Sequence, residues 1–210
     1  MMRILNILAN SVCAVLVALT LVACSEKEEE SEYVNWQAKN QLFIDSIAAE
    51  CDANVDGNWE KIVAFNLVDS VERIAPNPNH FVYVHKEAAG TGTYSPLFND
   101  SIRVHYMGRL IPSASYPQGY IFGKSYSTYV LNENTDVPTL MSVSSNIVGF
   151  ATATLHMVEG DHWTIYVPYY LGYGTSEYTS ANIPGYSTLI FDVKLAKIYR
   201  YKIDTNTTWY

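Results

Sequence analysis

The sequence predicts an α+β protein, with an antiparallel sheet packed on one short helix and a helical extension ahead of it. The sheet is predicted by four β-rich or alternating segments at 81–85, 101–110, 163–167 and 189–195, because strands with one buried face alternate apolar and polar residues. The helix is predicted at 149–158, where apolar residues recur on one side of a helical pattern. Many antiparallel strands with one short helix are typical of the α+β class.

The residues ahead of the sheet predict a helical N-terminal extension and a linker over 33–78. Apolar residues recur at helical spacing over 33–51, so we expect one amphipathic helix that packs on the following domain. The apolar run at 62–65 fits a strand or a helix equally well. A Pro-Asn-Pro-Asn run near the end of the extension indicates a linker. We therefore place the sheet domain at 79–201 and a C-terminal tail at 202–210.

The sequence of residues 1–23 is typical of a secretory signal peptide. Arg3 precedes a mostly apolar run over 4–23, which is followed at once by an acidic stretch. The Leu-Val-Ala-Cys sequence that ends at Cys24 resembles the lipobox of bacterial lipoproteins, in which the cysteine thiol receives a diacylglycerol. The resemblance implies cleavage before Cys24 and membrane attachment through lipid on that cysteine. An ordinary signal peptide that happens to end at a cysteine is the alternative.

Residues 24–32 predict an acidic tether between the lipid and the folded chain. Like charges in such a segment repel one another and keep it extended. Lys27, followed by three glutamates, resembles the surface-export signal of Bacteroidetes lipoproteins. This resemblance implies a lipoprotein of the cell envelope, in the outer membrane, and favours its external face.

The composition excludes some function classes. The chain carries a net charge of −8 and has no basic cluster, which argues against nucleic acid as a partner, because such binding depends on Lys and Arg at the phosphates. Of the three cysteines, Cys13 leaves with the signal peptide and Cys24 is the predicted lipid site. Cys51 then stands alone, so no intramolecular disulfide is expected, and we interpret it as a small buried apolar residue rather than a reactive thiol.

Familiar catalytic groupings are missing from the sequence. The five histidines show no metal-ligand spacing, and His85 and His105, which could be strand neighbours, are interpreted as surface residues. The sequence contains no glycine-rich phosphate loop and no nucleophile elbow. We therefore expect neither a metal nor another cofactor.

Five motifs that place aromatic residues beside glycines occur in order along the predicted sheet domain. They are Val-His-Tyr-Met-Gly at 104–108, Ile-Val-Gly-Phe at 147–150, Val-Glu-Gly-Asp at 158–161, Val-Pro-Tyr-Tyr-Leu-Gly-Tyr-Gly at 167–174, and Ile-Pro-Gly-Tyr-Ser-Thr-Leu-Ile-Phe-Asp-Val at 183–193. In order and spacing they resemble the motifs of FKBP-type peptidyl-prolyl cis-trans isomerases. The resemblance covers the whole domain and implies the FKBP-like fold, an antiparallel sheet wrapped around one short helix.

The same resemblance implies a proline-binding pocket. Carried over position by position, it comprises Tyr106, Phe122, Ile147, Phe150, Tyr173 and Phe191. Phe150 would be its floor, the Ile147 N–H and the Tyr173 hydroxyl would hold the substrate carbonyls, and Ile183 would also contact the substrate. The implied substrates are proline-containing polypeptides, and the reaction needs no cofactor.

The sequence departs from the family pattern next to this pocket. After Phe122 the family usually has Asp, and here Gly123 removes that carboxylate; Phe150 replaces the family's floor tryptophan, and Gly185 replaces a proline. The leading hypothesis is a prolyl isomerase acting on exported proteins. The alternative is an FKBP-like lipoprotein of the envelope that binds peptide or protein with little turnover. A glycan-binding role is suggested by the tyrosine content alone, which half-buried strands also explain.

Overall fold

The computed structural model describes residues 32–68 and 77–201. The predicted signal peptide, Cys24, nearly all of the acidic tether and the C-terminal tail lie outside these residues. Among the described helices, none is both long enough and apolar enough to cross a membrane.

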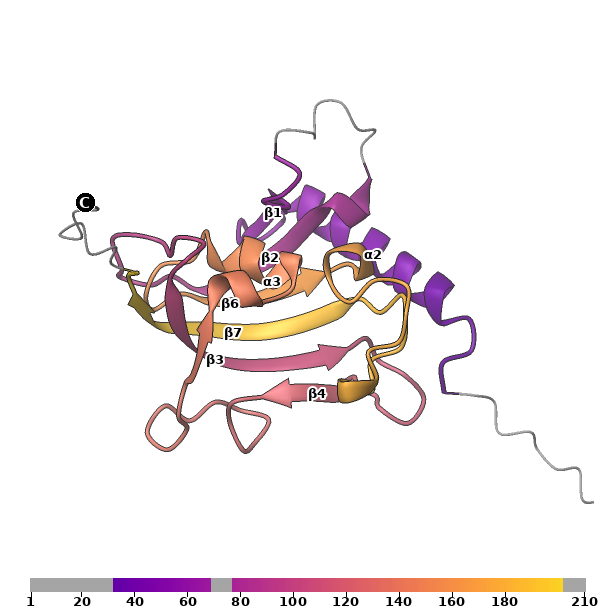
Figure 1. Cartoon of the computed structure of the whole chain (residues 1–210). Helices are drawn as coiled ribbons and strands as arrows, with labels where there is room; N and C mark the ends of the chain where they lie inside the picture. Colours follow the sequence, from indigo (N-terminus) through magenta and orange to yellow (C-terminus); the bar gives the residue numbers. More distant parts are fainter. Residues whose placement is uncertain (1–31, 69–76, 202–210) are drawn as a thin grey trace, which may run out of the picture. The chain divides into compact units, whose positions relative to one another are not determined.

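One antiparallel sheet organises the described chain (Figure 1). Its strands are β1 (Trp59–Val63), β2 (Phe81–Ala88), β3 (Ser101–Leu110), β4 (Ile121–Lys124), β5 (Thr139–Ser142), β6 (His162–Val167) and β7 (Leu189–Tyr199). They run in the order β1-β2-β6-β7-β3-β4, and β5 pairs with β3 beyond the end of β4. The long central pair β3 and β7 stays in register from one end of β3 to the other, with one bulge. The predicted α+β class is confirmed.

The inner face of the sheet carries the short helix α3 (Val148–Thr154). Residues of β6 alternate, and Trp163, Ile165 and Val167 are buried beneath the helix layer. The helix approaches the sheet closely at Gly149, where an added Cβ would lie 2.3 Å from Val167 Cγ1. A side chain at this position would therefore push the helix off the strand. The helix ends earlier than predicted, and the Asp161 carboxylate binds the Val158 N–H in the turn that follows.

The opposite, outer face of the sheet carries the helix α2 (Trp36–Ala53). Its buried residues Ile44, Ile47, Ala48 and Cys51 form one cluster with Tyr83 of β2. Phe43 adds a ring contact to Tyr166 of β6, with centroids 6.2 Å apart. Tyr83 and Tyr166 are register partners, so they share a face of the sheet, and the predicted amphipathic helix packs on that face.

The start of α2 is tied to the loop before β7. Trp36 Nε1 donates to Ser187 Oγ at 2.8 Å, and the Thr188 N–H donates to Asn40 Oδ1 at 2.7 Å. All four residues are buried. Because buried polar groups cost free energy unless they are paired, these hydrogen bonds fix both the position and the register of α2.

The predicted boundary at residue 79 divides a single folded unit. Residues 59–63 form β1, which pairs with the whole first half of β2 and extends the sheet by one strand. The described residues from Asn35 onward belong to one compact unit. The apolar run at 62–65, which the sequence left open, is thus the end of β1 and the two residues after it.

Short 3₁₀ turns complete the described structure at Pro78–His80, Val143–Ser145, Tyr169–Leu171 and Thr179–Ala181.

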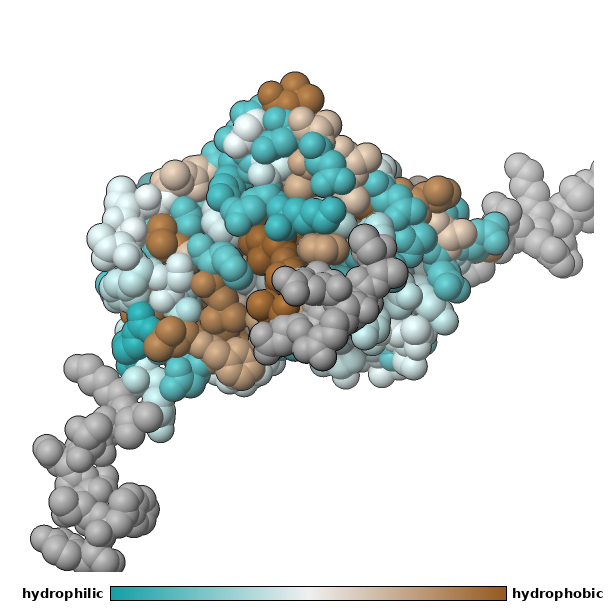
Figure 2. Space-filling view, turned by 90° about the horizontal axis from the view of Figure 1, so that it is seen from above, coloured by the Kyte–Doolittle hydropathy of each residue, from teal (hydrophilic) through white to brown (hydrophobic). Residues whose placement is uncertain are grey.

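His85 lies on β2 and His105 on β3, and these strands are not neighbours. His105 is buried, so its interpretation as a surface residue was wrong. Cys51 is buried and free, as expected. Viewed from above, apolar side chains gather in the middle of the face and continue towards its lower edge, below a band of polar side chains (Figure 2).

Candidate active site

A cavity of about 320 Å³ lies on the inner face of the sheet, beside the start of α3. It is lined by Tyr106, Phe122, Gly123, Met141, Ser145, Asn146, Ile147, Phe150, Tyr173, Tyr178, Ala181 and Phe191. The lining comes from β3, β4, β5, β7, α3 and the loops that flank them. All six residues of the predicted pocket therefore surround one cavity.

Phe191 is the centre of the aromatic wall. Its ring meets Phe122 edge-to-face at a centroid distance of 5.5 Å and Phe150 at 5.2 Å. Phe150 and Phe191 are 3% and 6% exposed, so they form the dry part of the cavity. Edge-to-face pairs of this kind add about 0.5–1.5 kcal/mol beyond their buried area, which holds the three rings in one arrangement.

Gly108 makes room for this cluster. It lies on β3 directly opposite Gly123 of β4 and Phe191 of β7. An added Cβ on Gly108 would lie 2.4 Å from Phe122 Cε2 and 2.9 Å from Phe191 Cε1. The glycine of the Val-His-Tyr-Met-Gly motif is therefore required because two phenyl rings rest against its backbone.

Ile147 and Tyr173, which also line the cavity, each carry a hydrogen-bond donor. Ile147 is the residue just before α3, so its N–H has no acceptor within the helix. The Tyr173 ring stacks on Tyr178 with centroids 4.3 Å apart and planes 10° apart. Burial raises the pKa of Tyr173, so its hydroxyl stays protonated and able to donate at neutral pH. A substrate carbonyl has donors available here but meets no charged group.

The family model for FKBP-type peptidyl-prolyl cis-trans isomerases matches residues 92–196, half of the chain. The chain belongs to this family. The FKBP-type match runs from before β3 into β7, and so includes every residue that lines the cavity.

Curated relatives of the FKBP-type domain include the macrophage infectivity potentiator of Trypanosoma cruzi, which is 34% identical over 53% of this chain and 50% of the relative. Another is the FKBP-type 22 kDa peptidyl-prolyl cis-trans isomerase of Escherichia coli, 34% identical over 49% of this chain and 43% of the relative. The chain thus spans about half the length of these relatives. A crystal structure of a peptidyl-prolyl cis-trans isomerase from Pseudomonas syringae has the same fold, with a TM-score of 0.53, 20% identity, and coverage of 78% of this chain and 96% of that one.

The FKBP-type cavity has no carboxylate among its lining residues, since Gly123 stands where the family usually has Asp. An added Cβ on Gly123 would lie 3.3 Å from Tyr106 Oη. This is a tight contact with the tip of a side chain, so a small tilt of the Tyr106 ring would accommodate it. The backbone at this position is therefore compatible with the family's usual residue.

Ile183, predicted to contact substrate, does not line the cavity. Its side chain is fully buried. Its backbone pairs with that of Tyr178 through hydrogen bonds of 2.8 and 3.2 Å, which close the loop between them. Tyr178 and Ala181 of the same loop line the cavity instead. Sequence reasoning missed Tyr178, Ala181, Met141, Ser145 and Asn146. The signal for Tyr178 was a second tyrosine shortly after Tyr173, in the connection between two motifs.

Proposed function

We propose that the protein is a peptidyl-prolyl cis-trans isomerase that acts on X-Pro bonds of exported proteins. The proposal depends chiefly on one observation: Phe122 and five residues from four separate motifs surround a single aromatic cavity without a charged lining. The family membership supports the same reaction.

The chemistry suits this lining. The C–N bond of a peptide has partial double-bond character, and its rotation has a barrier of about 18–20 kcal/mol. The twisted amide of the transition state has lost resonance, so it is less polar across the C–N bond and tolerates an apolar environment better than the planar amide does. Phe150 and Phe191 provide that environment. No nucleophile, metal or cofactor takes part in such a step.

The donors at the edge of the cavity orient the substrate. The Ile147 N–H and the Tyr173 hydroxyl can each donate a hydrogen bond to a substrate carbonyl, one on either side of the proline. A substrate held at both ends places its proline ring against Phe150 while the bond between twists. Stacking against Tyr178 restricts the Tyr173 ring before substrate binds. Less side-chain conformational entropy is therefore lost when the Tyr173 hydroxyl binds a substrate carbonyl.

The test is a protease-coupled isomerisation assay on a proline-containing tetrapeptide. We expect Tyr173→Phe to lower kcat/KM by about threefold to tenfold, the value of one neutral hydrogen bond. Tyr170→Phe is the matched control, since Tyr170 belongs to the same turn, is 57% exposed and does not line the cavity. Phe150→Leu should also lower kcat/KM while keeping the core filled.

A folded wild-type protein without catalysis would refute the proposal. Binding of a proline peptide under the same conditions would then favour the alternative, an FKBP-like binding protein with little turnover.

We further propose that the protein is a lipoprotein of the outer membrane, attached through lipid on Cys24. The Leu-Val-Ala-Cys sequence and the acidic residues after it support this location. Labelling of cells with a radioactive fatty acid should mark the wild-type protein but not Cys24→Ser, which should also leave the membrane fraction. Equal labelling of both proteins would exclude Cys24 as the attachment site.

A further inference from the structure

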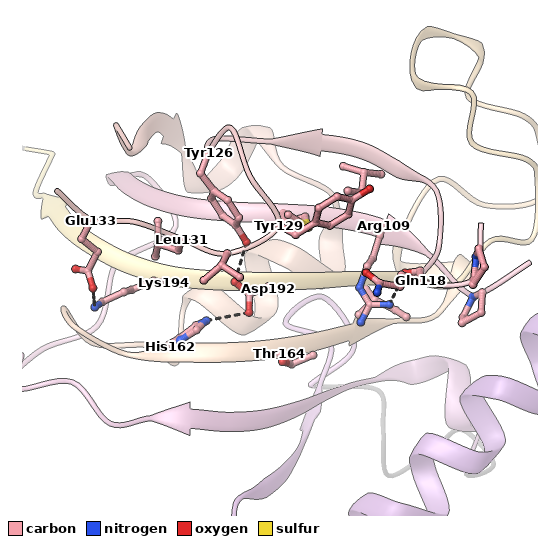
Figure 3. A pocket seen from close by; sticks show the side chains of 16 residues that line it. Arg109, Gln118, Tyr126, Tyr129, Leu131, Glu133, His162, Thr164, Asp192 and Lys194 are labelled. Atoms are coloured by element: carbon pink, nitrogen blue, oxygen red, sulfur yellow. Dashed lines mark hydrogen bonds and ion pairs between the residues drawn. The ribbon is translucent and has the colours of Figure 1, made fainter. Parts of the chain in front are cut away.

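A second cavity, of about 570 Å³, lies on the outer face of the sheet (Figure 3). Its floor is formed by residues of β3, β6 and β7 that alternate with those of the proline pocket: Asp192 follows Phe191, and Met107 follows Tyr106. Two connecting segments, 111–120 and 125–138, supply its walls. The two cavities therefore occupy opposite faces of the same strands.

The carboxylates in this outer cavity are already paired. Asp192 accepts from Tyr126 Oη at 3.1 Å on one oxygen and from His162 Nε2 at 2.9 Å on the other. Glu133 pairs with Lys194, and Figure 3 shows this pair at the end of the cavity away from Arg109, with Asp192 between them. Both carboxylates therefore already have hydrogen-bond or ion-pair partners within the cavity.

Arg109 differs from the other basic residues in the cavity. It donates from Nη1 to the backbone oxygen of Gln118 at 2.9 Å, which holds the guanidinium in place. Within residues 32–68 and 77–201 it forms no ion pair with a carboxylate. A guanidinium has five N–H donors, so most of those on Arg109 are available to an anionic ligand, although the chain as a whole is acidic.

The rim of the cavity is apolar and open to solvent. Tyr129 and Val130 line the cavity and are 70% and 76% exposed. Their segment is held by its own contacts, since the Asp136 carboxylate accepts from the N–H of Asn132 at 2.8 Å and from that of Ser127 at 3.4 Å. Exposed apolar side chains on an ordered segment are typical of protein-binding surfaces, whereas small-molecule sites enclose most of their ligand.

We propose that this outer cavity binds an extended, acidic and apolar polypeptide segment, whose carboxylate pairs with Arg109 and whose apolar side chains contact Tyr129 and Val130. The proposal rests on the proposed function in one respect: the segment belongs to the same protein substrates whose prolines enter the inner pocket. Holding one segment on the outer face raises the effective concentration of a proline elsewhere in that substrate.

The test uses the purified protein and a fluorescein-labelled, proline-free peptide that alternates Glu with Leu and Phe, with fluorescence anisotropy as the readout. Because this peptide contains no proline, we do not expect it to bind in the inner pocket. We expect Arg109→Gln to weaken binding about tenfold or more, because a charge-assisted hydrogen bond is lost. Replacing Glu by Gln in the peptide should have the same effect. Arg103→Gln is the matched control, since Arg103 also lies on β3 and also donates to a backbone oxygen, but does not line the cavity.

A second variant, Tyr129→Ser, changes an exposed rim residue and should not disturb folding of the core. We expect Tyr129→Ser to weaken peptide binding about threefold. Isomerisation of the tetrapeptide should be unchanged in Arg109→Gln and Tyr129→Ser, so a failure of catalysis and a failure of outer-face binding are distinguishable. Equal binding by Arg109→Gln and wild type would overturn the proposal. Full displacement of the peptide by benzoate at the same carboxylate concentration would also overturn it, in favour of a small-anion site.

Discussion

Substitution of Gly108 by alanine tests whether the strand backbone holds the aromatic wall in place. The added Cβ would lie 2.4 Å from Phe122 Cε2 and 2.9 Å from Phe191 Cε1. Carbon atoms in contact prefer about 3.5–4.0 Å, so the Phe122 ring must move by roughly 1.1–1.6 Å. A displacement of about 1 Å in a positioning group can cost about 100-fold in rate. Overpacking in a core costs about 1–3 kcal/mol in stability.

We therefore expect Gly108→Ala to lower kcat/KM on the proline tetrapeptide by about 30-fold to 100-fold. The melting temperature should fall by about 2–4 °C for each kcal/mol lost. The protein should stay folded, because Phe122 is only half-buried and can turn outward. Near-ultraviolet circular dichroism would confirm that the core is intact.

Gly123→Ala is the matched control, since Gly123 is the register partner of Gly108 on β4. Its added Cβ meets the Tyr106 hydroxyl at 3.3 Å, a contact that a slight tilt of the ring relieves. We expect kcat/KM within about threefold of wild type, a change of under 1 kcal/mol. If Gly108→Ala retained wild-type kcat/KM and melting temperature, then Phe122 and Phe191 would not be packed on β3 as described.

Three further predictions concern the carboxylate, the outer helix and pH. Gly123→Asp should raise kcat/KM in the isomerisation assay if the missing carboxylate limits catalysis, and an unchanged value would show that it does not. Ile44→Ala should lower the free energy of unfolding by about 2–5 kcal/mol, because Ile44 is 1% exposed in the α2 interface; a urea titration with no change would show that α2 is not part of the cooperative unit. His85 binds Asp56 through Nε2 at 2.6 Å and Glu87 through Nδ1 at 2.9 Å, and these hydrogen bonds raise its pKa. Its stabilisation is therefore fully present below about pH 6.5 and is lost as pH rises through the raised pKa of the folded state, so the difference in melting temperature between wild type and His85→Gln should shrink from about pH 6 to about pH 9.

Local patterns predicted most of the strands and the family, because alternation and short motifs depend on neighbours in the chain. The strand predicted at 101–110 coincides with β3, and the segments at 163–167 and 189–195 lie within β6 and β7. Each motif has an aromatic residue or a glycine at a fixed number of residues from the end of a strand or helix. Several such motifs in the same order along the chain are therefore enough to predict one fold. The roles assigned to the individual pocket residues stay predictions.

Contacts between distant parts of the chain could not be predicted in this way. The apolar run at 62–65 has no period, and only pairing with β2 makes its first half a strand. The position of α2 depends on a hydrogen bond between Trp36 and Ser187, which are 151 residues apart. Ile183 is buried, Tyr178 lines the cavity, and their backbones pair with each other, which no local pattern signals.

An antiparallel sheet with an aromatic pocket on one face could be predicted from the sequence, because most residues of that pocket lie in recognisable motifs. What lies on the other face depends on tertiary contacts. There, Arg109, Asp192 and Tyr129 come from separate segments with no shared motif, and the outer cavity exists because two connections fold over strands whose alternate side chains point away from the proline pocket.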